Sequence, residues 1–119
     1  MTTNAKILVV EDDPSILEVL GIALTSEGHS FTPLKDPTGL ISQIQQEKPD
    51  VILLDLMMKN VSTINPLVWL RSNPTLKSKV VLMSAHADLP HIAEEHGVDY
   101  LSKPFSLDEL TNIINRNIT

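Results

Sequence analysis

Several polar side chains come directly after short apolar runs, at the positions where buried strands would end. They are an acid pair, a single acid, a hydroxyl and an ammonium: Glu11 and Asp12, Asp55, Ser84, and Lys103. Carboxylate oxygens suit hard divalent cations, and an ammonium can neutralise a phosphoryl oxygen. We therefore expect these groups to form one site for a divalent metal and a phosphoryl group, with Asp55 as the nucleophile.

A carboxylate attacks a phosphoryl group poorly because both are anionic, so charge must be neutralised first. A small, hard cation with oxygen ligands can do this, which favours Mg²⁺ over softer metals. Lys103 would neutralise a further phosphoryl oxygen as a point charge. The product would be an aspartyl phosphate, and the protein would contribute mainly positioning and electrostatic stabilisation.

The elements that must position these groups alternate between strand and helix. Strands are expected at residues 6–10, 30–34, 51–54, 80–83 and 99–102, and helices after Asp13, Asp36, Asn65, Asp88 and Ser106. Strands joined by helices pair in parallel through right-handed crossovers. In such open sheets ligands bind at the carboxyl ends of the strands, which is where all the polar groups above are found.

Local signals fix several of these boundaries. Asp13 precedes a proline and suits a helix N-cap, and Gly28 suits a left-handed helix end. Ser106 and Glu109 have the spacing of a capping box at the start of the last helix. Pro33 removes a backbone donor, which predicts that its strand lies at the edge of the sheet.

The composition fits one globular domain covering residues 1–119, with 42% apolar and 20% charged residues. The absence of cysteine excludes disulfides, zinc–cysteine sites and thiol catalysis. A net charge of −6 argues against direct nucleic-acid binding by this domain. No secretory signal or membrane-length apolar run is visible, so we expect a cytoplasmic protein with no membrane partner.

Four segments resemble, in order and spacing, the receiver domain of response regulators in two-component phosphorelay systems. They are residues 7–14, 49–58, 80–85 and 99–105, and each is weak alone but specific with the others. The resemblance implies a flavodoxin-like (βα)5 three-layer α/β sandwich with strand order 2-1-3-4-5. It also implies that Asp55 accepts a phosphoryl group from a phosphohistidine on a sensor histidine kinase or phosphotransfer protein.

The resemblance further implies roles for the other residues. The implied Mg²⁺ ligands are Glu11, Asp12, Asp55 and the backbone carbonyl of Met57. Ser84 matches the switch hydroxyl and Tyr100 the switch aromatic, although Tyr100 is equally suited to the core. Lys103 matches the site lysine, and its bond to Pro104 is expected to be cis.

By this resemblance the chain is a regulatory phosphoacceptor, not an enzyme beyond its own phosphorylation and dephosphorylation. Its further partner would be a downstream protein or a covalently linked output domain, and a phosphorylation-dependent dimer is compatible with the family. The chain would be either a stand-alone regulator or the receiver portion of a longer protein. Phosphorylation would draw Ser84 toward the phosphoryl group and let Tyr100 rotate inward. The face formed by the fourth helix, the fifth strand and the fifth helix would then change.

The chain departs from the family pattern in three places. Lys59 and Thr63 stand four and eight residues past Asp55, where proline and glycine are common. Lys59 would place a cation near the acids and compete weakly with a metal. The helix expected at 88–96 is about a turn short, and Glu11 replaces the more common aspartate and can reach a metal through water.

Other functions remain open on the sequence. One alternative is a receiver-like module that binds a partner but is not phosphorylated. The unusual loop after Asp55 and the short helix are compatible with it. A haloacid-type phosphatase would need an acid at Met57, and a flavodoxin would need a glycine- or hydroxyl-rich loop after the first strand. His86 lies two residues past Ser84 and is equally suited to contact a phosphoryl group or to face solvent. A histidine metal site is not expected, because His91 and His96 are five residues apart.

Overall fold

Five parallel strands form the central sheet of the computed structural model, which describes residues 4–58, 61–73 and 76–118. The strands are β1 (Lys6–Val10), β2 (Ser30–Leu34), β3 (Val51–Asp55), β6 (Lys79–Ser84) and β7 (Asp99–Ser102). Their order across the sheet is β2-β1-β3-β6-β7, and every pair is parallel. When only the five strands of this sheet are numbered along the chain, the order is the predicted 2-1-3-4-5. The proline-containing β2 lies at one edge, as predicted.

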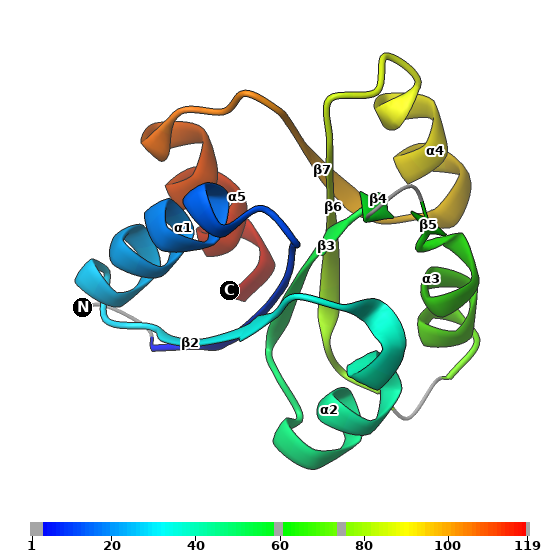
Figure 1. Cartoon of the computed structure of the whole chain (residues 1–119), viewed down its shortest axis with the longest axis horizontal. Helices are drawn as coiled ribbons and strands as arrows, with labels where there is room; N and C mark the ends of the chain where they lie inside the picture. The colour runs from blue at the N-terminus through cyan, green and yellow to red at the C-terminus, as the bar shows by residue number, and fades with distance from the viewer. Residues whose placement is uncertain (1–3, 59–60, 74–75, 119) are drawn as a thin grey trace.

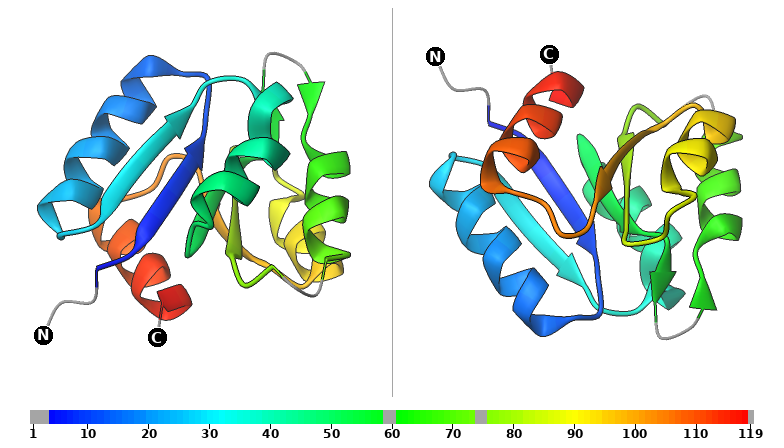
Figure 2. Two further views of the ribbon diagram at one scale, coloured as in Figure 1. Left: turned by 90° about the horizontal axis from the view of Figure 1, so that it is seen from below. Right: turned by 90° about the horizontal axis from the view of Figure 1, so that it is seen from above.

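Helices cover both faces of this sheet and complete the predicted three-layer flavodoxin-like fold. They are α1 (Pro14–Ser26), α2 (Leu40–Glu47), which follows the short 3₁₀ turn η1 (Pro37–Gly39), α3 (Ile64–Arg71), α4 (Leu89–His96) and α5 (Leu107–Ile118). Helices α1 and α5 lie on one face, and α2, α3 and α4 lie on the other (Figures 1 and 2). This division follows from the right-handed crossovers, which reverse side where the chain passes from one half of the sheet to the other.

The central strands are apolar throughout because both of their faces are covered. Leu53 and Val81 pack in the core beneath α1 and α5, whereas Leu54 and Leu82 pack in the core beneath α2, α3 and α4. Successive side chains of a strand point to opposite faces, so one unbroken apolar run supplies both cores. The burial continues to the end of β3 and includes Asp55.

The predicted caps are present. The Asp13 side chain accepts a hydrogen bond from the Ser15 N–H at 2.9 Å. Ser106 and Glu109 exchange side-chain and backbone hydrogen bonds, each of 3.1 Å, which confirms the capping box. Gly28 has φ +89°, a left-handed backbone conformation in which any other residue would be strained.

The segment after Asp55, which the sequence predicts to be a loop, contains regular secondary structure. Two short strands, β4 (Met57–Met58) and β5 (Val61–Ser62), pair there as an antiparallel ribbon. Two residues in each strand are too few for an alternating pattern to be recognised in the sequence. Lys59 lies outside the described residues, so its predicted competition with a metal is not addressed by the structure. Helix α3 begins at Ile64, two residues before the start predicted after Asn65.

Candidate metal and phosphoacceptor site

Three carboxylates meet at the carboxyl ends of the adjacent strands β1 and β3. Glu11, Asp12 and Asp55 each offer an oxygen, and these oxygens all lie within 4.8 Å of one another. Glu11 and Asp55 are buried, with 1% and 5% of their surface exposed. The donors are all carboxylate oxygens, which is a set suited to a hard cation such as Mg²⁺. The strand ends thus bring these acids together as the sequence predicts.

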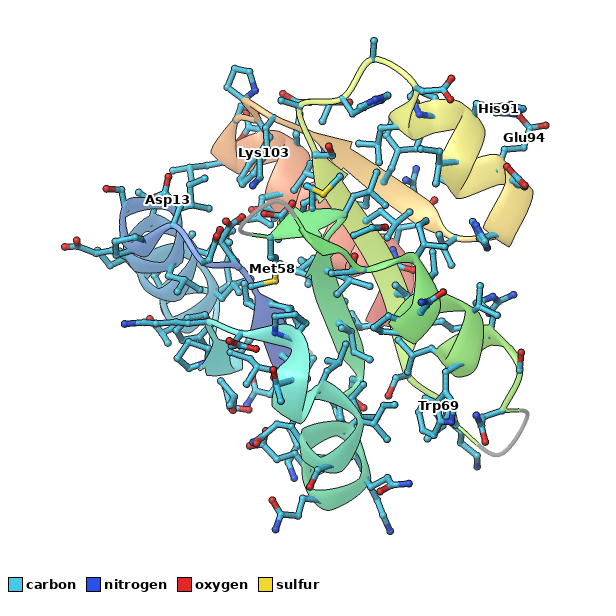
Figure 3. The ribbon with its side chains drawn as sticks, turned by 45° about the vertical axis from the view of Figure 1, so that its right-hand side comes forward. Asp13, Met58, Trp69, His91, Glu94 and Lys103 are labelled. Carbon is cyan, nitrogen blue, oxygen red and sulfur yellow. The ribbon has the colours of Figure 1, made fainter. Side chains whose placement is uncertain are left out.

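Lys103 reaches into the acidic cluster from the loop between β7 and α5. Its Nζ lies 2.5 Å from the Glu11 Oε2 and 3.2 Å from the Asp55 Oδ2. The Lys103 N–H donates to the Ser84 carbonyl at 2.9 Å, which ties this loop to the end of β6. In Figure 3 Lys103 lies at the same end of the molecule as Asp13, far from Trp69. The peptide bond to Pro104 is cis, as expected.

Glu11 uses both of its carboxylate oxygens within the protein. Oε2 accepts from Lys103, and Oε1 accepts from the Asp13 N–H at 3.2 Å. The sequence predicted that Glu11 faces a metal but not that it pairs with Lys103, because the two are 92 positions apart. Glu11 nevertheless offers one of its oxygens to the group of carboxylate oxygens that could hold a metal.

Asp55 is held by its neighbours in the chain. Its Oδ1 accepts from the Met57 N–H at 3.2 Å, and its Oδ2 faces Lys103. The Leu56 N–H donates to the Met83 carbonyl at 2.9 Å, so β3 remains bonded to β6 one residue beyond Asp55. Asp55 therefore presents a fixed carboxylate with one oxygen toward the ammonium.

Ser84 and His86 lie at the end of the neighbouring strand. Ser84 is buried, and its Oγ accepts from the His86 N–H at 3.0 Å. The His86 Nδ1 in turn accepts from the Asp88 N–H at 3.0 Å. This second bond ties the His86 ring to the loop before α4 through one of its two nitrogens, and a contact of His86 with a phosphoryl group stays a prediction.

Tyr100 lies on β7 beside the register partner Leu82 of β6. Its side chain is 41% exposed, whereas the next residue, Leu101, is buried. The sequence left Tyr100 open between core and switch, and this exposure excludes a core position. Its role in switching remains a proposal.

The charges at the site shift each other's protonation. Burial raises the pKa of Glu11 above its ordinary value of 4.5, although the hydrogen bond from Lys103 opposes that rise. Burial alone would lower the pKa of Lys103. The hydrogen bond with Glu11 and the negative charge of Asp55 outweigh it, and they raise the pKa of Lys103 above 10.5. Lys103 is therefore charged at neutral pH.

The raised pKa of Glu11 predicts a pH dependence of stability in the metal-free protein. A carboxyl that binds its proton more tightly when folded stabilises the fold most below 4.5, and this contribution falls as pH rises through the raised pKa. Relative to Glu11→Gln, the parent is thus expected to lose free energy of unfolding between pH 4.5 and neutral. Urea unfolding in EDTA at a series of pH values measures the difference.

The control for this measurement is Glu18→Gln, which changes an exposed glutamate on α1. The loss of stability measured against Glu11→Gln should exceed any change measured against this control. A parent that gains stability over Glu11→Gln as pH rises would contradict the prediction, because the ion pair with Lys103 would then outweigh burial.

An apolar cavity of about 410 Å³ opens beside the site. Lys103 forms part of its wall, and its apolar lining consists of Ile16, Val19, Ala85, Pro104 and Phe105. Val19 is 51% exposed, so this lining reaches the molecular surface. The cavity places an apolar surface next to Lys103, whose ammonium contacts Asp55.

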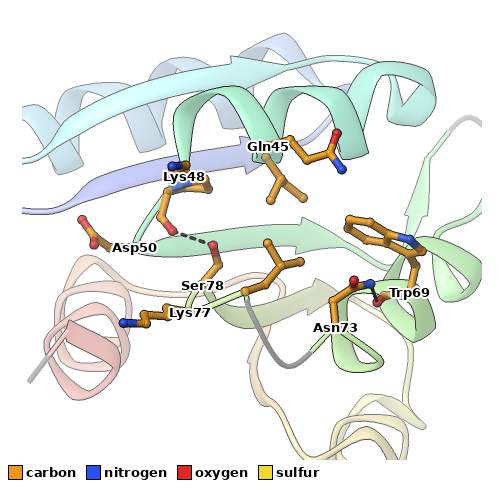
Figure 4. A pocket seen from close by; sticks show the side chains of 10 residues that line it. Gln45, Lys48, Asp50, Trp69, Asn73, Lys77 and Ser78 are labelled. Carbon is orange, nitrogen blue, oxygen red and sulfur yellow. Dashed lines mark hydrogen bonds between the residues drawn. The ribbon is translucent and has the colours of Figure 1, made fainter.

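A second cavity, of about 630 Å³, lies at the opposite end of the sheet, where the strands begin. Trp69 and Gln45 are at one end of it, and Lys48, Asp50 and Lys77 are at the other (Figure 4). It contains none of the residues of the acidic site. Among the described residues no helix is long and apolar enough to cross a membrane.

A doubly wound parallel sheet with buried acids and a lysine at its carboxyl ends is the architecture of a receiver-type signalling domain. The family model for the response regulator receiver domain matches residues 7–115. The chain therefore belongs to the response regulator receiver domain family.

Curated relatives are full-length regulators of which the chain matches a part. The DNA-binding transcriptional regulator NtrC of Proteus hauseri is 35% identical over 98% of the chain and 25% of its own length. The probable transcriptional regulatory protein TcrX of Mycobacterium tuberculosis is 38% identical over 87% of the chain and 45% of its own length. The chain spans between a quarter and a half of the curated relatives it matches.

Solved receiver structures share the whole fold. The receiver domain of the Francisella response regulator 1452 is 30% identical with a TM-score of 0.85, covering 97% of both chains. A putative response regulator from Chloroflexus aurantiacus is 25% identical with a TM-score of 0.86, covering 98% of both chains. The likeness extends over the complete sandwich, including the strand ends that carry the acids.

Proposed function

We propose that residues 1–119 act as one receiver that accepts a phosphoryl group on Asp55 in a Mg²⁺-dependent reaction. The donor would be a phosphohistidine of a sensor histidine kinase or phosphotransfer protein. The observation that carries this proposal is the Lys103 ammonium, which contacts both Glu11 and Asp55 within a cluster of three carboxylates. Such a cluster offers a nucleophile, a site for a metal cation and a contact with the ammonium of Lys103.

The reaction exchanges one phosphorus bond for another. A carboxylate oxygen of Asp55 forms a bond to phosphorus while the N–P bond of the donor breaks and its electron pair returns to the donor imidazole. The Met57 N–H, which donates to Oδ1, orients the carboxylate. Glu11, Asp12, Asp55 and the carbonyl of Met57 would hold Mg²⁺, which when bound supplies positive charge against the phosphoryl oxygens.

Lys103 supplies the second positive charge. Its ammonium contacts the Asp55 Oδ2 at 3.2 Å, so a phosphoryl group on Asp55 would lie within its reach. The ammonium would then exchange a carboxylate oxygen for a phosphoryl oxygen, acting as a point charge. The domain in this way assists its own phosphorylation and is otherwise not an enzyme.

The same phosphoryl group would drive a switch. The Ser84 Oγ accepts from His86, which leaves its own O–H to donate to a phosphoryl oxygen. Movement of Ser84 would open space beside β6, and the half-exposed Tyr100 would rotate inward. The surface of α4, β7 and α5 would change as a shift between two populated states.

Incubation with acetyl phosphate tests the acceptor chemistry. The parent protein is expected to gain one phosphoryl group in the presence of Mg²⁺ and none in EDTA, measured by intact mass. An unmodified protein, under conditions that label a control receiver, would favour the alternative of a binding module that is not phosphorylated. The switch is tested separately with beryllofluoride and Mg²⁺, and unchanged amide shifts in α4 and α5 would contradict it.

We infer the remaining partners from the family. The full-length relatives NtrC and MtrA are named as DNA-binding, and the chain matches only part of each. We propose a cytoplasmic receiver that signals to a downstream protein or a linked output domain, with a phosphorylation-dependent dimer as one form of output. With its net charge of −6 the domain itself is not expected to bind nucleic acid or membranes.

The apolar cavity beside Lys103 suits the phosphodonor. A donor must bring its phosphohistidine to Asp55, and apolar contacts next to the site would hold it there. Val19→Glu, which charges the rim of the cavity, is expected to slow phosphotransfer from a donor protein about tenfold, the effect of losing about 1.4 kcal/mol of contact energy. Phosphorylation by acetyl phosphate, which needs no protein contact, should be unchanged.

Ile22→Glu is the matched control, because Ile22 is an exposed apolar residue of the same helix that does not line the cavity. It should leave both reactions as in the parent. Equal slowing by both substitutions, or slowing with acetyl phosphate as well, would contradict docking at the cavity.

A further inference from the structure

Thr63 is a fully buried polar residue that lies directly behind the acceptor strand, and its exposed fraction is 0%. Its backbone N–H donates to the Leu56 carbonyl at 2.9 Å. Its Oγ1 donates to the Asp55 carbonyl at 2.7 Å and approaches the Leu56 carbonyl at 3.1 Å. One hydroxyl proton is thus shared between two carbonyls, mainly with the nearer one.

These hydrogen bonds hold the two peptide groups that follow the acceptor. On its other side the Leu56 N–H donates to the Met83 carbonyl at 2.9 Å, so Leu56 is fixed between β6 and Thr63. The Met57 N–H, on the next peptide group, donates to the Asp55 Oδ1 at 3.2 Å. The orientation of that peptide group depends on the carbonyl of Leu56, to which Thr63 is bonded.

The carbonyl of Met57 is the next one along the chain and is a proposed ligand of Mg²⁺. Its position depends on the Leu56–Met57 peptide group and on the pairing of Met57 with Ser62 in the β4–β5 ribbon. Thr63 directly follows Ser62, so one residue anchors both the end of β3 and the return strand of the ribbon. Side chains that hydrogen-bond behind metal ligands orient those ligands and tune affinity.

We propose that Thr63 is a positioning residue of the phosphoacceptor site. Its hydroxyl fixes the backbone from Asp55 to Met57 and so sets the geometry of the carboxylate and of the Met57 carbonyl. It does not touch the phosphoryl group. This inference rests on the proposed function, because Thr63 acts through groups that are assigned there to the acceptor and the metal.

Two substitutions separate the hydroxyl from the shape of the side chain. Thr63→Val keeps the shape and removes the donor, whereas Thr63→Ser keeps the donor and removes a methyl group. Calorimetric titration with Mg²⁺ alone is expected to show affinity weakened about tenfold in Thr63→Val, the lower end of the effect of partners behind metal ligands. Thr63→Ser is expected to bind Mg²⁺ as the parent does.

Phosphorylation by acetyl phosphate gives a second readout. Thr63→Val should be labelled more slowly than the parent at low Mg²⁺, and the deficit should shrink as Mg²⁺ approaches saturation. The control is Ser72→Ala, which removes another hydroxyl bonded to a backbone carbonyl, that of Val68 in α3, far from the acids. It should match the parent in both measurements.

Equal Mg²⁺ affinity in Thr63→Val and the parent would overturn the proposal, as would a Thr63→Ser variant as weak as Thr63→Val. If Thr63→Val does not fold, Thr63→Ala replaces it, and the comparison with Thr63→Ser decides in the same way. Failure of the parent to be phosphorylated would instead count against the proposed function. The Mg²⁺ titrations would still test Thr63 in that case, so the two failures are distinguishable.

Discussion

Asp55→Asn is expected to abolish phosphorylation by acetyl phosphate, with no adduct detectable by intact mass. The amide lacks the negative charge of the carboxylate, and its single oxygen is a poor nucleophile. Its oxygen can still accept the hydrogen bond that the Met57 N–H donates to Oδ1 in the parent. The fold should therefore persist while the chemistry is lost.

The control for this substitution is Asp50→Asn, which changes an acid directly before β3, at the opposite end of that strand from Asp55. Asp50 is exposed, and its side chain accepts from the Lys6 N–H at 2.8 Å. This variant should be labelled as fully as the parent. An adduct that survives in Asp55→Asn would show that another residue is the acceptor.

Lys103→Met is expected to lower the free energy of unfolding of the metal-free protein by about 3 kcal/mol, because it removes one partner of a buried ion pair. We take the lower end of the usual cost because the lysine side chain is 18% exposed. Without the ammonium, the buried carboxylates of Glu11 and Asp55 face one another uncompensated. Mg²⁺ should restore much of this loss and should bind more tightly than to the parent. Urea unfolding in EDTA and in MgCl₂ measures both effects.

The same variant should be phosphorylated much more slowly than the parent even at saturating Mg²⁺, because one phosphoryl oxygen lacks its partner. Lys79→Met, at the exposed start of β6, is the matched control and should resemble the parent in stability and in labelling. A Lys103→Met protein as stable as the parent in EDTA would show that the ammonium does not compensate the acids.

Much of the fold could be predicted because its signals are local. The apolar runs of β1, β3 and β6 identify strands covered on both faces, and their alternation with helices requires parallel pairing. Asp13 and Gly28 mark the two ends of α1, and both have the predicted geometry. The β4–β5 ribbon was missed because its pairing is too short to leave a pattern.

The residues of the acidic site could also be predicted, because the carboxyl ends of parallel strands all lie at the same end of the sheet. The sequence could not reveal how the members pair. Glu11 and Lys103 are brought into contact only by the packing of the β7–α5 loop against β1, at a separation of 92 positions. Their contact and its effect on both pKa values emerge from tertiary structure.

For Thr63 the sequence did not predict a role in the site. The sequence marked it as a departure from the family pattern, where glycine is common, and so as a source of doubt about the loop. The structure gives it three hydrogen-bond contacts to the carbonyls of Asp55 and Leu56. A buried hydroxyl is costly unless it is bonded, but which backbone groups it meets is decided by the path of the chain.

The most direct measurement of the central claim is the location of the phosphoryl group on the parent protein. Labelling with acetyl phosphate and Mg²⁺, reduction of the acyl phosphate with borohydride, and peptide mass mapping would identify the modified residue. We expect a single modified residue, Asp55, with none in the matched sample containing EDTA. Modification at Glu11, Asp12 or a histidine instead, or none where a control receiver is labelled, would contradict it.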